Sequence, residues 1–206
     1  MLYHSLAKHL LEIILIAGLI EVAPVKAQDL EKAPVFSLQS VTGETHNLEQ
    51  YQGKYVVLEW MNFRCRTVDI LYKNRVLPIM QNAFKEKDVV WLSIVSEAQG
   101  KQGQVSPDKM RKQLEKRGGN QDAVLMDVLG IVGPQYEAVV SPHFALVDPE
   151  GMLIYQGAFD NQPDGALSDN EGAINYVSDA LNQSMNGEEV RYPVTESYGC
   201  PIRYGR

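Results

Sequence analysis

The sequence predicts an α/β fold built on one mixed sheet with helices on its faces. Two apolar runs of strand length, 55–60 and 89–95, have the composition of strands that are buried on both faces. Segments with helical spacing separate these runs, and a strand–turn–strand pattern follows with its turn at 148–151. We therefore expect parallel strands joined by crossover helices, with an antiparallel hairpin at one edge.

The first half of the chain is expected to contain short strands at 34–38 and 45–48. After the first buried strand, helical spacing runs over 66–87. Proline is costly inside a helix, so we expect a break within 74–77 and a second helix that opens at Pro78.

The second half contains clear helix signals. Ser106 and Pro107 are typical of an N-cap and a first helical position, and Gly118-Gly119 of a helix end. The remaining expected elements are strands at 123–126, 144–147 and 152–156, a short helical turn within 131–136, and a last helix from a cap at Ser168 or Asp169 to Met185.

Length and composition favour one soluble globular domain. The chain has 206 residues, of which 45% are hydrophobic and 22% are charged, and these values are ordinary for a globular protein. The formal net charge of −7 argues against a nucleic-acid partner, because phosphate binding needs a basic face.

The N-terminal segment resembles a secretory signal peptide that is removed after Ala27. A weakly basic start with Lys8 precedes an apolar run at 10–20, and Val25 and Ala27 are small residues at the two positions that a signal peptidase reads. The run is too short for a stable membrane span, which takes about 20 residues. We expect export to the periplasm or secretion; an uncleaved anchor or a wrongly assigned start site is the alternative.

The two cysteines, Cys65 and Cys200, lie far apart in the sequence. Cys200 belongs to a tail at 188–206 without clear periodicity, which follows the signal peptide at 1–27 and one domain at 28–187. In an exported protein an isolated pair of cysteines indicates one disulfide or one redox couple. Neither cysteine has a second cysteine or a histidine at metal-ligand spacing, which argues against a zinc site.

Cys65 is the candidate nucleophile, because it lies just after a buried strand and at the start of a helix. Sites of open α/β sheets collect at such positions. The positive end of the helix and the flanking Arg64 and Arg66 favour the thiolate, which is the reactive form. The alternative is that Cys65 is a small buried hydrophobic residue.

Glu59 and Ser141-Pro142 are further candidate site residues. Glu59 is ionisable inside the most apolar strand, and a buried acid near a nucleophile suits proton exchange. The alternative is that Glu59 points outward or pairs with a lysine or arginine. Pro142 opens a strand, where proline is tolerated and the preceding bond can be cis. His143 is a candidate base, although a histidine at a strand start is more often structural.

Several segments occur together in an order that resembles a known group. They are Ala33-Pro34-Val35-Phe36-Ser37-Leu38, Leu48-x-x-Tyr51-x-Gly53-Lys54, the strand that places Glu59 six residues before Cys65, Gly100-Lys101-Gln102-Gly103, Ser141-Pro142, the turn at 148–151, and Tyr198-Gly199-Cys200. The chain thus resembles the thioredoxin superfamily over about 33–204. Within it the match is to the peroxiredoxin-like branch of alkyl hydroperoxide reductase, thiol-specific antioxidant and redoxin proteins, and the ending is like that of exported members.

The resemblance implies a thioredoxin-like fold, a central mixed sheet flanked by helices, followed by the C-terminal tail. It gives Cys65 the position of the nucleophile, Glu59 that of the buried acid, and Pro142 that of a cis-proline beside the thiol. It implies no cofactor and no metal. The implied partners are protein or small-molecule disulfides and thiols, and peroxides.

The sequence departs from the pattern of this group at three positions. Thioredoxins have a second cysteine three residues after the first, where this chain has Val68, so a vicinal disulfide is impossible. Peroxidatic sites have threonine three residues before the cysteine and proline directly after it, where this chain has Asn62 and Arg66. Asn62 could still donate a hydrogen bond to the sulfur. We therefore hypothesise that the tail returns across the site and pairs Cys200 with Cys65, as a redox couple or as a permanent staple.

Three functions follow from these features. The first is a thiol–disulfide oxidoreductase, in which Cys65 attacks a disulfide and Cys200 or an external thiol releases the mixed intermediate. The second is a peroxidase-type antioxidant protein, in which the same sulfur forms a sulfenic acid. The third is a non-enzymatic binding or structural protein with a stapling disulfide, since a fold alone does not confer chemistry.

Overall fold

The structure is a computed structural model that describes residues 31–163 and 172–205. Its strands are β1 (Ser37–Ser40), β2 (Thr45–Asn47), β3 (Val56–Trp60), β4 (Val90–Val95), β5 (Ala123–Met126), β6 (Val140–Ser141), β7 (His143–Val147), β8 (Leu153–Gly157) and β9 (Cys200–Pro201). Its helices are η1 (Leu48–Tyr51), α1 (Arg66–Lys73), α2 (Val76–Lys85), α3 (Pro107–Arg117), α4 (Val132–Gln135) and α5 (Tyr176–Met185). None of the described helices is long and apolar enough to cross a membrane. The predicted signal peptide at 1–27 lies outside the described residues.

The central sheet is mixed, as the sequence predicts, with seven strands in the order β2-β1-β5-β4-β3-β7-β8. β3 pairs in parallel with β4 and β4 with β5, whereas β7 runs antiparallel to β3 and forms the hairpin with β8. Helices α1 and α2 connect β3 to β4, and α3 connects β4 to β5. The carboxyl ends of these parallel strands therefore meet at one edge of the sheet, where Cys65 follows β3.

Two apolar layers pack on the two faces of the sheet. On β3, Val57 faces a cluster that also contains Cys65 and Tyr72, whereas Leu58 and Trp60 face a second cluster. This alternation is the ordinary result of a strand's two-residue period. Both faces of β3 are thus buried, as its unbroken apolar composition predicts.

The N-terminal strands are shifted relative to the prediction. β1 spans Ser37–Ser40 instead of 34–38, and β2 ends at Asn47 because Leu48 opens η1. The backbone N–H of Asn47 donates to Oε1 of Gln50 at 3.0 Å. This capping interaction at Asn47 starts the short helix and ends the strand.

The break between α1 and α2 falls within 74–77, as predicted, but α2 begins earlier than predicted. α1 ends before Asn74, and Arg75 adopts a left-handed conformation at φ 61° before α2 begins at Val76. Pro78 is consequently the third residue of α2 and not its first. The proline is tolerated there because the first N–H groups of a helix have no partner within the helix.

The last helix begins later than predicted. Its N-cap is Asn175, whose side chain accepts a backbone N–H of the first turn at 2.9 Å. Residues 172–174 are not helical, so a start at Ser168 or Asp169 is wrong, and those two residues lie outside the described part of the chain. The predicted cap of α3 by Ser106 is confirmed.

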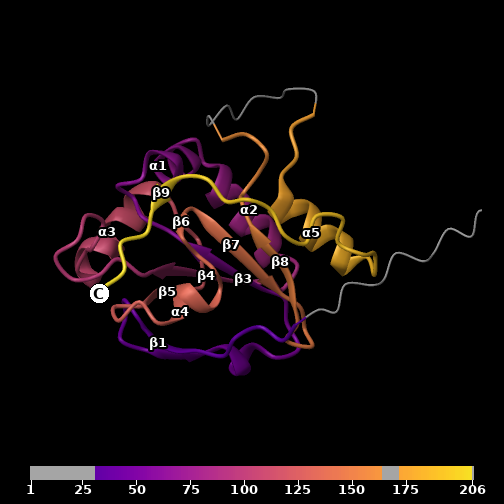
Figure 1. Ribbon diagram of the computed structural model, residues 1–206, viewed down its shortest axis with the longest axis horizontal. Helices are drawn as coiled ribbons and strands as arrows, with labels where there is room; N and C mark the ends of the chain where they lie inside the picture. The colour runs from indigo at the N-terminus through magenta and orange to yellow at the C-terminus, as the bar shows by residue number, and fades with distance from the viewer. Residues whose placement is uncertain (1–30, 164–171, 206) are drawn as a thin grey trace, which may run out of the picture.

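The C-terminal tail, which shows no periodicity in the sequence, crosses the end of the sheet from α5 toward α3 (Figure 1). Near its start, the N–H of Thr195 donates to the carbonyl oxygen of Gln156 on β8 at 3.0 Å. Farther along, β9 pairs antiparallel with β6, which places Cys200 opposite Ser141. The tail is therefore an ordered part of the domain.

Two glycines allow the tail backbone to lie directly against the sheet. A Cβ on Gly199, whose φ is +138°, would lie 2.0 Å from the carbonyl oxygen of Ser141. A Cβ on Gly157, whose φ is +145°, would lie 2.5 Å from the carbonyl oxygen of Thr195. Both neighbours are backbone atoms, so a side chain at either glycine would displace the tail.

We expect Gly199→Ala to lower the free energy of unfolding by about 2 to 4 kcal/mol, because it adds a backbone clash to the cost of a positive φ. Urea denaturation measures this loss. Gly43→Ala is the matched control: Gly43 has φ +89° and no atom near its Cβ position, so only the conformational cost of about 1 kcal/mol applies. Equal losses in the two variants would contradict close docking of the tail at Gly199.

Candidate active site

A disulfide joins Cys65 to Cys200 across 135 residues of sequence, with 5.6 Å between the two Cα atoms. The hypothesis that the tail returns and pairs the two cysteines is confirmed. Cys65 is the N-cap of α1, and Cys200 is the first residue of β9. The bridge therefore ties the start of the first helix to the tail.

The backbone around Cys65 fixes its sulfur at the N-terminal end of α1. The N–H of Cys65 donates to the carbonyl oxygen of Asn62 at 2.8 Å, and its carbonyl accepts the N–H of Asp69 at 2.9 Å as the first helical bond. The sulfur lies 3.1 Å from the carbonyl oxygen of Ser141. In the disulfide this is a contact and not a hydrogen bond, because the sulfur carries no proton.

The environment of Cys65 contains opposing influences on its charge. The residue is 1% exposed, and burial together with the Ser141 carbonyl oxygen opposes a negative sulfur. The helix N-terminus favours it. Arg64 and Arg66, which flank the cysteine as the sequence indicates, are both exposed, so solvent screens part of their effect.

The cis peptide bond predicted from the resemblance is present between Ser141 and Pro142. It lies between β6, which pairs with the tail, and β7, which pairs with β3. Ser141 is therefore in contact with both cysteines, through its carbonyl oxygen at Cys65 and its strand pairing with Cys200.

Glu59 points inward and is fully buried. Its Oε2 accepts the indole N–H of Trp91 at 2.7 Å and the hydroxyl of Ser93 at 3.0 Å, and the hydroxyl of Tyr72 lies 3.1 Å from both carboxyl oxygens. The amide of Gln81 donates to the same Tyr72 hydroxyl at 3.2 Å. The alternative of an outward side chain paired with a cation is thus wrong, since these partners are all neutral.

Burial raises the pKa of Glu59, and the hydrogen bonds from Trp91, Ser93 and Tyr72 oppose part of this rise. Tyr72 keeps its proton, because burial and the neighbouring Glu59 raise its pKa well above the usual range. Glu59 also shares a face of β3 with the core cluster that contains Cys65. The carboxyl is therefore held in place by neutral donors within the core layer to which Cys65 belongs.

Glu97 is a site residue that the sequence analysis missed. It is 4% exposed, and its two oxygens bind different segments: Oε1 accepts the side-chain N–H of Asn62 at 2.8 Å, and Oε2 accepts the backbone N–H of Arg203 at 2.9 Å. The N–H of Ala98 donates back to the carbonyl oxygen of Arg203 at 2.9 Å. Glu97 thus connects the loop before Cys65 to the tail. An ionisable residue two positions after a buried strand was the available signal.

The side chain of Asn62 is held by other groups than the sulfur. Its amide donates to Glu97, and its Oδ1 accepts the backbone N–H of Arg64 at 2.9 Å. A Cβ on Gly103 would lie 2.2 Å from the Asn62 amide nitrogen, so the loop around Gly103 covers this side chain closely. The hydrogen bond from Asn62 to the sulfur of Cys65 that the sequence analysis allowed for is not among its contacts.

His143 contacts the tail and not the disulfide. Its Nδ1 lies 2.8 Å from the hydroxyl oxygen of Ser197, and its ring packs edge-on against Trp60 with centroids 5.5 Å apart. Burial lowers the pKa of His143 to about 4, so the imidazole is neutral at neutral pH. These contacts fit the structural role for His143 better than the role of a base.

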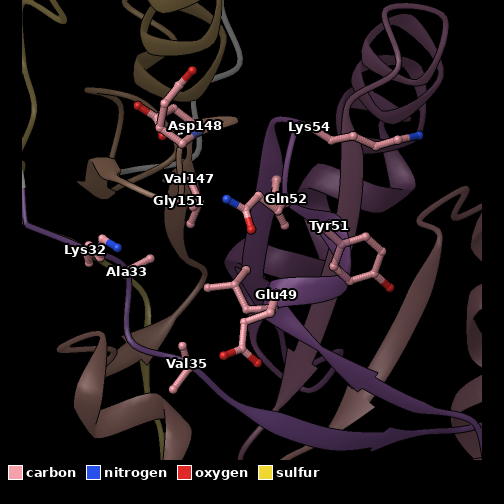
Figure 2. Close-up of a pocket in the computed structure, with 13 residues that line it drawn as sticks. Lys32, Ala33, Val35, Glu49, Tyr51, Gln52, Lys54, Val147, Asp148 and Gly151 are labelled. Carbon is pink, nitrogen blue, oxygen red and sulfur yellow. Dashed lines mark hydrogen bonds between the residues drawn. The ribbon is translucent and has the colours of Figure 1, made fainter.

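A cavity of about 290 Å³ lies at the opposite end of β3 from Cys65. Figure 2 shows side chains from the segment before β1, from η1 and from the β7–β8 turn around it, among them Lys32, Glu49 and Asp148. None of the predicted site residues lines it. Among the residues that the structure describes, no group of histidine, cysteine and acidic side chains could hold a metal ion.

The pH dependence of stability tests the burial of Glu59. Because its folded-state pKa is raised, the folded protein binds more protons than the unfolded chain above about pH 4.5, and the free energy of unfolding falls as pH rises. Glu59→Gln removes this loss. We therefore expect the free energy of unfolding of the variant, relative to that of the wild type, to increase as pH rises above about 4.5, by up to about 1.4 kcal/mol per pH unit. Urea denaturation from pH 4 to pH 8 measures it. Parallel curves for the two proteins would contradict the shift.

Solved structures share this architecture. A hypothetical protein from Sinorhizobium meliloti matches with a TM-score of 0.75 and 21% identity, over 85% of this chain and 94% of that chain. An uncharacterized conserved protein from Geobacillus kaustophilus matches with a TM-score of 0.73 and 24% identity, over 85% and 92%. An exposed lipoprotein thioredoxin from Streptococcus pneumoniae matches with a TM-score of 0.51 and 25% identity, over 75% and 99%.

No protein-family model matches the sequence, and no curated protein matches it significantly. The assignment therefore rests on the strand order, the cis-proline before β7 and the structural matches. The chain has the thioredoxin-like fold that the sequence predicts.

Proposed function

We propose that this protein is a thiol–disulfide oxidoreductase whose redox couple is Cys65 and Cys200. The observation that carries the proposal is the disulfide itself, which joins a sulfur at the N-terminus of α1 to a sulfur on the tail beside the cis-proline Pro142. Thiol exchange needs no cofactor, and a single bridge within reach of solvent can store and release two electrons.

In the proposed reaction the thiolate of Cys65 is the nucleophile in the reduced protein. It attacks one sulfur of a partner disulfide, forms a mixed disulfide and releases the other partner sulfur as a thiolate. Cys200 then attacks the sulfur of Cys65, releases the second partner thiol and closes the bridge. The two cysteines are oxidised, and the partner gains two electrons and two protons.

Glu59 is proposed as the acid that exchanges protons with the site during this cycle. Burial keeps its pKa above the usual range of a carboxyl, so its proton is available nearer to neutral pH. Its position on the same face of β3 as the cluster of Cys65 supports this role. Arg64 and Arg66 are proposed to favour the thiolate from the solvent side, and Ser141 and Asn62 to shape the site.

The proposed partners are proteins or small molecules with disulfides or thiols. We propose export, with a signal peptide at 1–27, a redoxin-type domain at 28–187 and the tail at 188–206. The Cys65–Cys200 disulfide supports export, because disulfides persist in oxidising compartments. The peroxidase alternative loses its supporting interaction, since the amide of Asn62 binds Glu97.

Activity on a model protein disulfide tests the proposal. We expect the wild-type protein to speed thiol-dependent reduction of insulin, and Cys65→Ser to reduce the rate to the uncatalysed level because the nucleophile is lost. Cys200→Ser is the matched variant: it also lacks the bridge but retains Cys65, so it should accumulate a mixed disulfide with the substrate. Equal activity in the wild type and in Cys65→Ser would overturn the proposal.

The reduction potential separates a redox couple from a permanent staple. We expect the Cys65–Cys200 bridge to have a potential above about −300 mV, because structural disulfides typically lie below that value. Equilibration in dithiothreitol redox buffers, followed by mapping of the two cysteine peptides, measures it. A lower potential would support the third function, a structural disulfide without catalysis.

A further inference from the structure

The two cysteines of the bridge differ in their exposure to solvent, and this difference indicates which of them an external thiol attacks. Cys65 is 1% exposed within the main core cluster, whereas Cys200 packs against the same cluster but is partly exposed. We infer that the external thiol that reduces this protein attacks the sulfur of Cys200, so that the mixed disulfide with the reductant forms on the tail. The inference rests on the proposed function, because it concerns the reduction of the same bridge.

Access favours attack at Cys200. A thiolate attacks a disulfide in line with the S–S bond, from the side opposite to the sulfur that leaves, and the rate depends on whether that side can be reached. Cys65 is buried in the main core cluster, and the carbonyl oxygen of Ser141 lies 3.1 Å from its sulfur. An approaching anion would also be repelled by that oxygen. The neighbours of Cys200 in the tail, Gly199 and Pro201, are exposed.

The stability of the leaving thiolate also favours attack at Cys200. Attack at Cys200 releases Cys65 as a thiolate at the N-terminus of α1 between Arg64 and Arg66, and a better stabilised thiolate leaves faster. Attack at Cys65 would instead release Cys200, which belongs to a two-residue strand and is not itself a helix N-cap. Burial of Cys65 opposes its thiolate, so access is the stronger of the two arguments.

The tail remains in place when the bridge opens, because other contacts hold it on both sides of Cys200. Before the cysteine, the N–H of Thr195 donates to Gln156 at 3.0 Å. After it, the N–H of Ile202 donates to the carbonyl oxygen of Val139 at 3.0 Å, and the carboxylate of Glu97 binds the tail one residue farther on. The adduct on Cys200 therefore forms on a tail that is still docked beside Cys65.

The electron balance requires a second thiol. The first thiolate bonds to the sulfur of Cys200 and releases the thiolate of Cys65. A second thiol of the same donor, or of another donor molecule, then attacks the donor sulfur of the adduct and releases the thiolate of Cys200. The donor leaves as a disulfide, and its two electrons remain on the two cysteines, each of which takes up a proton from solvent.

Mapping of the first adduct tests the inference. The oxidised full chain is mixed with reduced glutathione, quenched with acid within the first turnover, and labelled at its free thiols with a maleimide before peptide mapping under non-reducing conditions. We expect glutathione on Cys200 and maleimide on Cys65 in at least tenfold excess over the reverse pattern. The same reaction in denaturing urea is the matched control, in which both sulfurs are accessible and the ratio should fall to within about threefold.

The outcomes distinguish this inference from the proposed function. Glutathione on Cys65 in the folded protein, or equal amounts on both cysteines, would overturn the assignment of Cys200 while leaving the insulin activity of the wild type intact. Reduction only in urea would overturn both, because the bridge would then be closed to thiols in the folded state. An excess on Cys200 that urea abolishes would support the assignment.

Discussion

The contact between the tail backbone and strand β6 positions both halves of the site. It exists because Gly199 has no side chain, so that the tail lies against the carbonyl of Ser141. The same carbonyl oxygen touches the sulfur of Cys65, and the strand pairing sets Cys200 opposite. One peptide unit thereby fixes the spacing of two cysteines that are 135 residues apart. This backbone contact therefore helps to set the geometry of the bridge and the difference in exposure between Cys65 and Cys200.

Two buried carboxyl groups hold the surroundings of the bridge in different ways. Glu59 is fixed entirely by neutral donors of the core, so its surroundings do not depend on the tail. Glu97 instead binds one group from the loop before the cysteine and one from the tail, Asn62 and Arg203. A change in the position of the tail therefore removes a hydrogen bond from Glu97 but not from Glu59. Of these two carboxyl groups, it is Glu97 that couples the tail to the loop before Cys65.

The sequence predicts those parts of the structure that depend on local patterns. The mixed sheet, the strand that carries Glu59 and the helix after Cys65 follow from apolar periodicity and capping residues. The pairing of the tail depends on backbone hydrogen bonds and on two glycines, which leave no periodic pattern, and only the isolated pair of cysteines suggested it. Glu97 escaped notice because a glutamate at a strand end looks the same in sequence whether it is buried or exposed. The start of α5 was misplaced because Ser168, Asp169 and Asn175 are equally good caps.

The two tryptophans give the protein an internal optical readout of separate regions. The indole N–H of Trp91 binds the carboxyl of Glu59, so its emission should respond to the protonation of that acid. Trp60 packs against His143, which in turn contacts Ser197 of the tail. Because the chain contains no other tryptophan, replacing either one by phenylalanine would leave a single fluorophore that reports on the acid or on the tail alone.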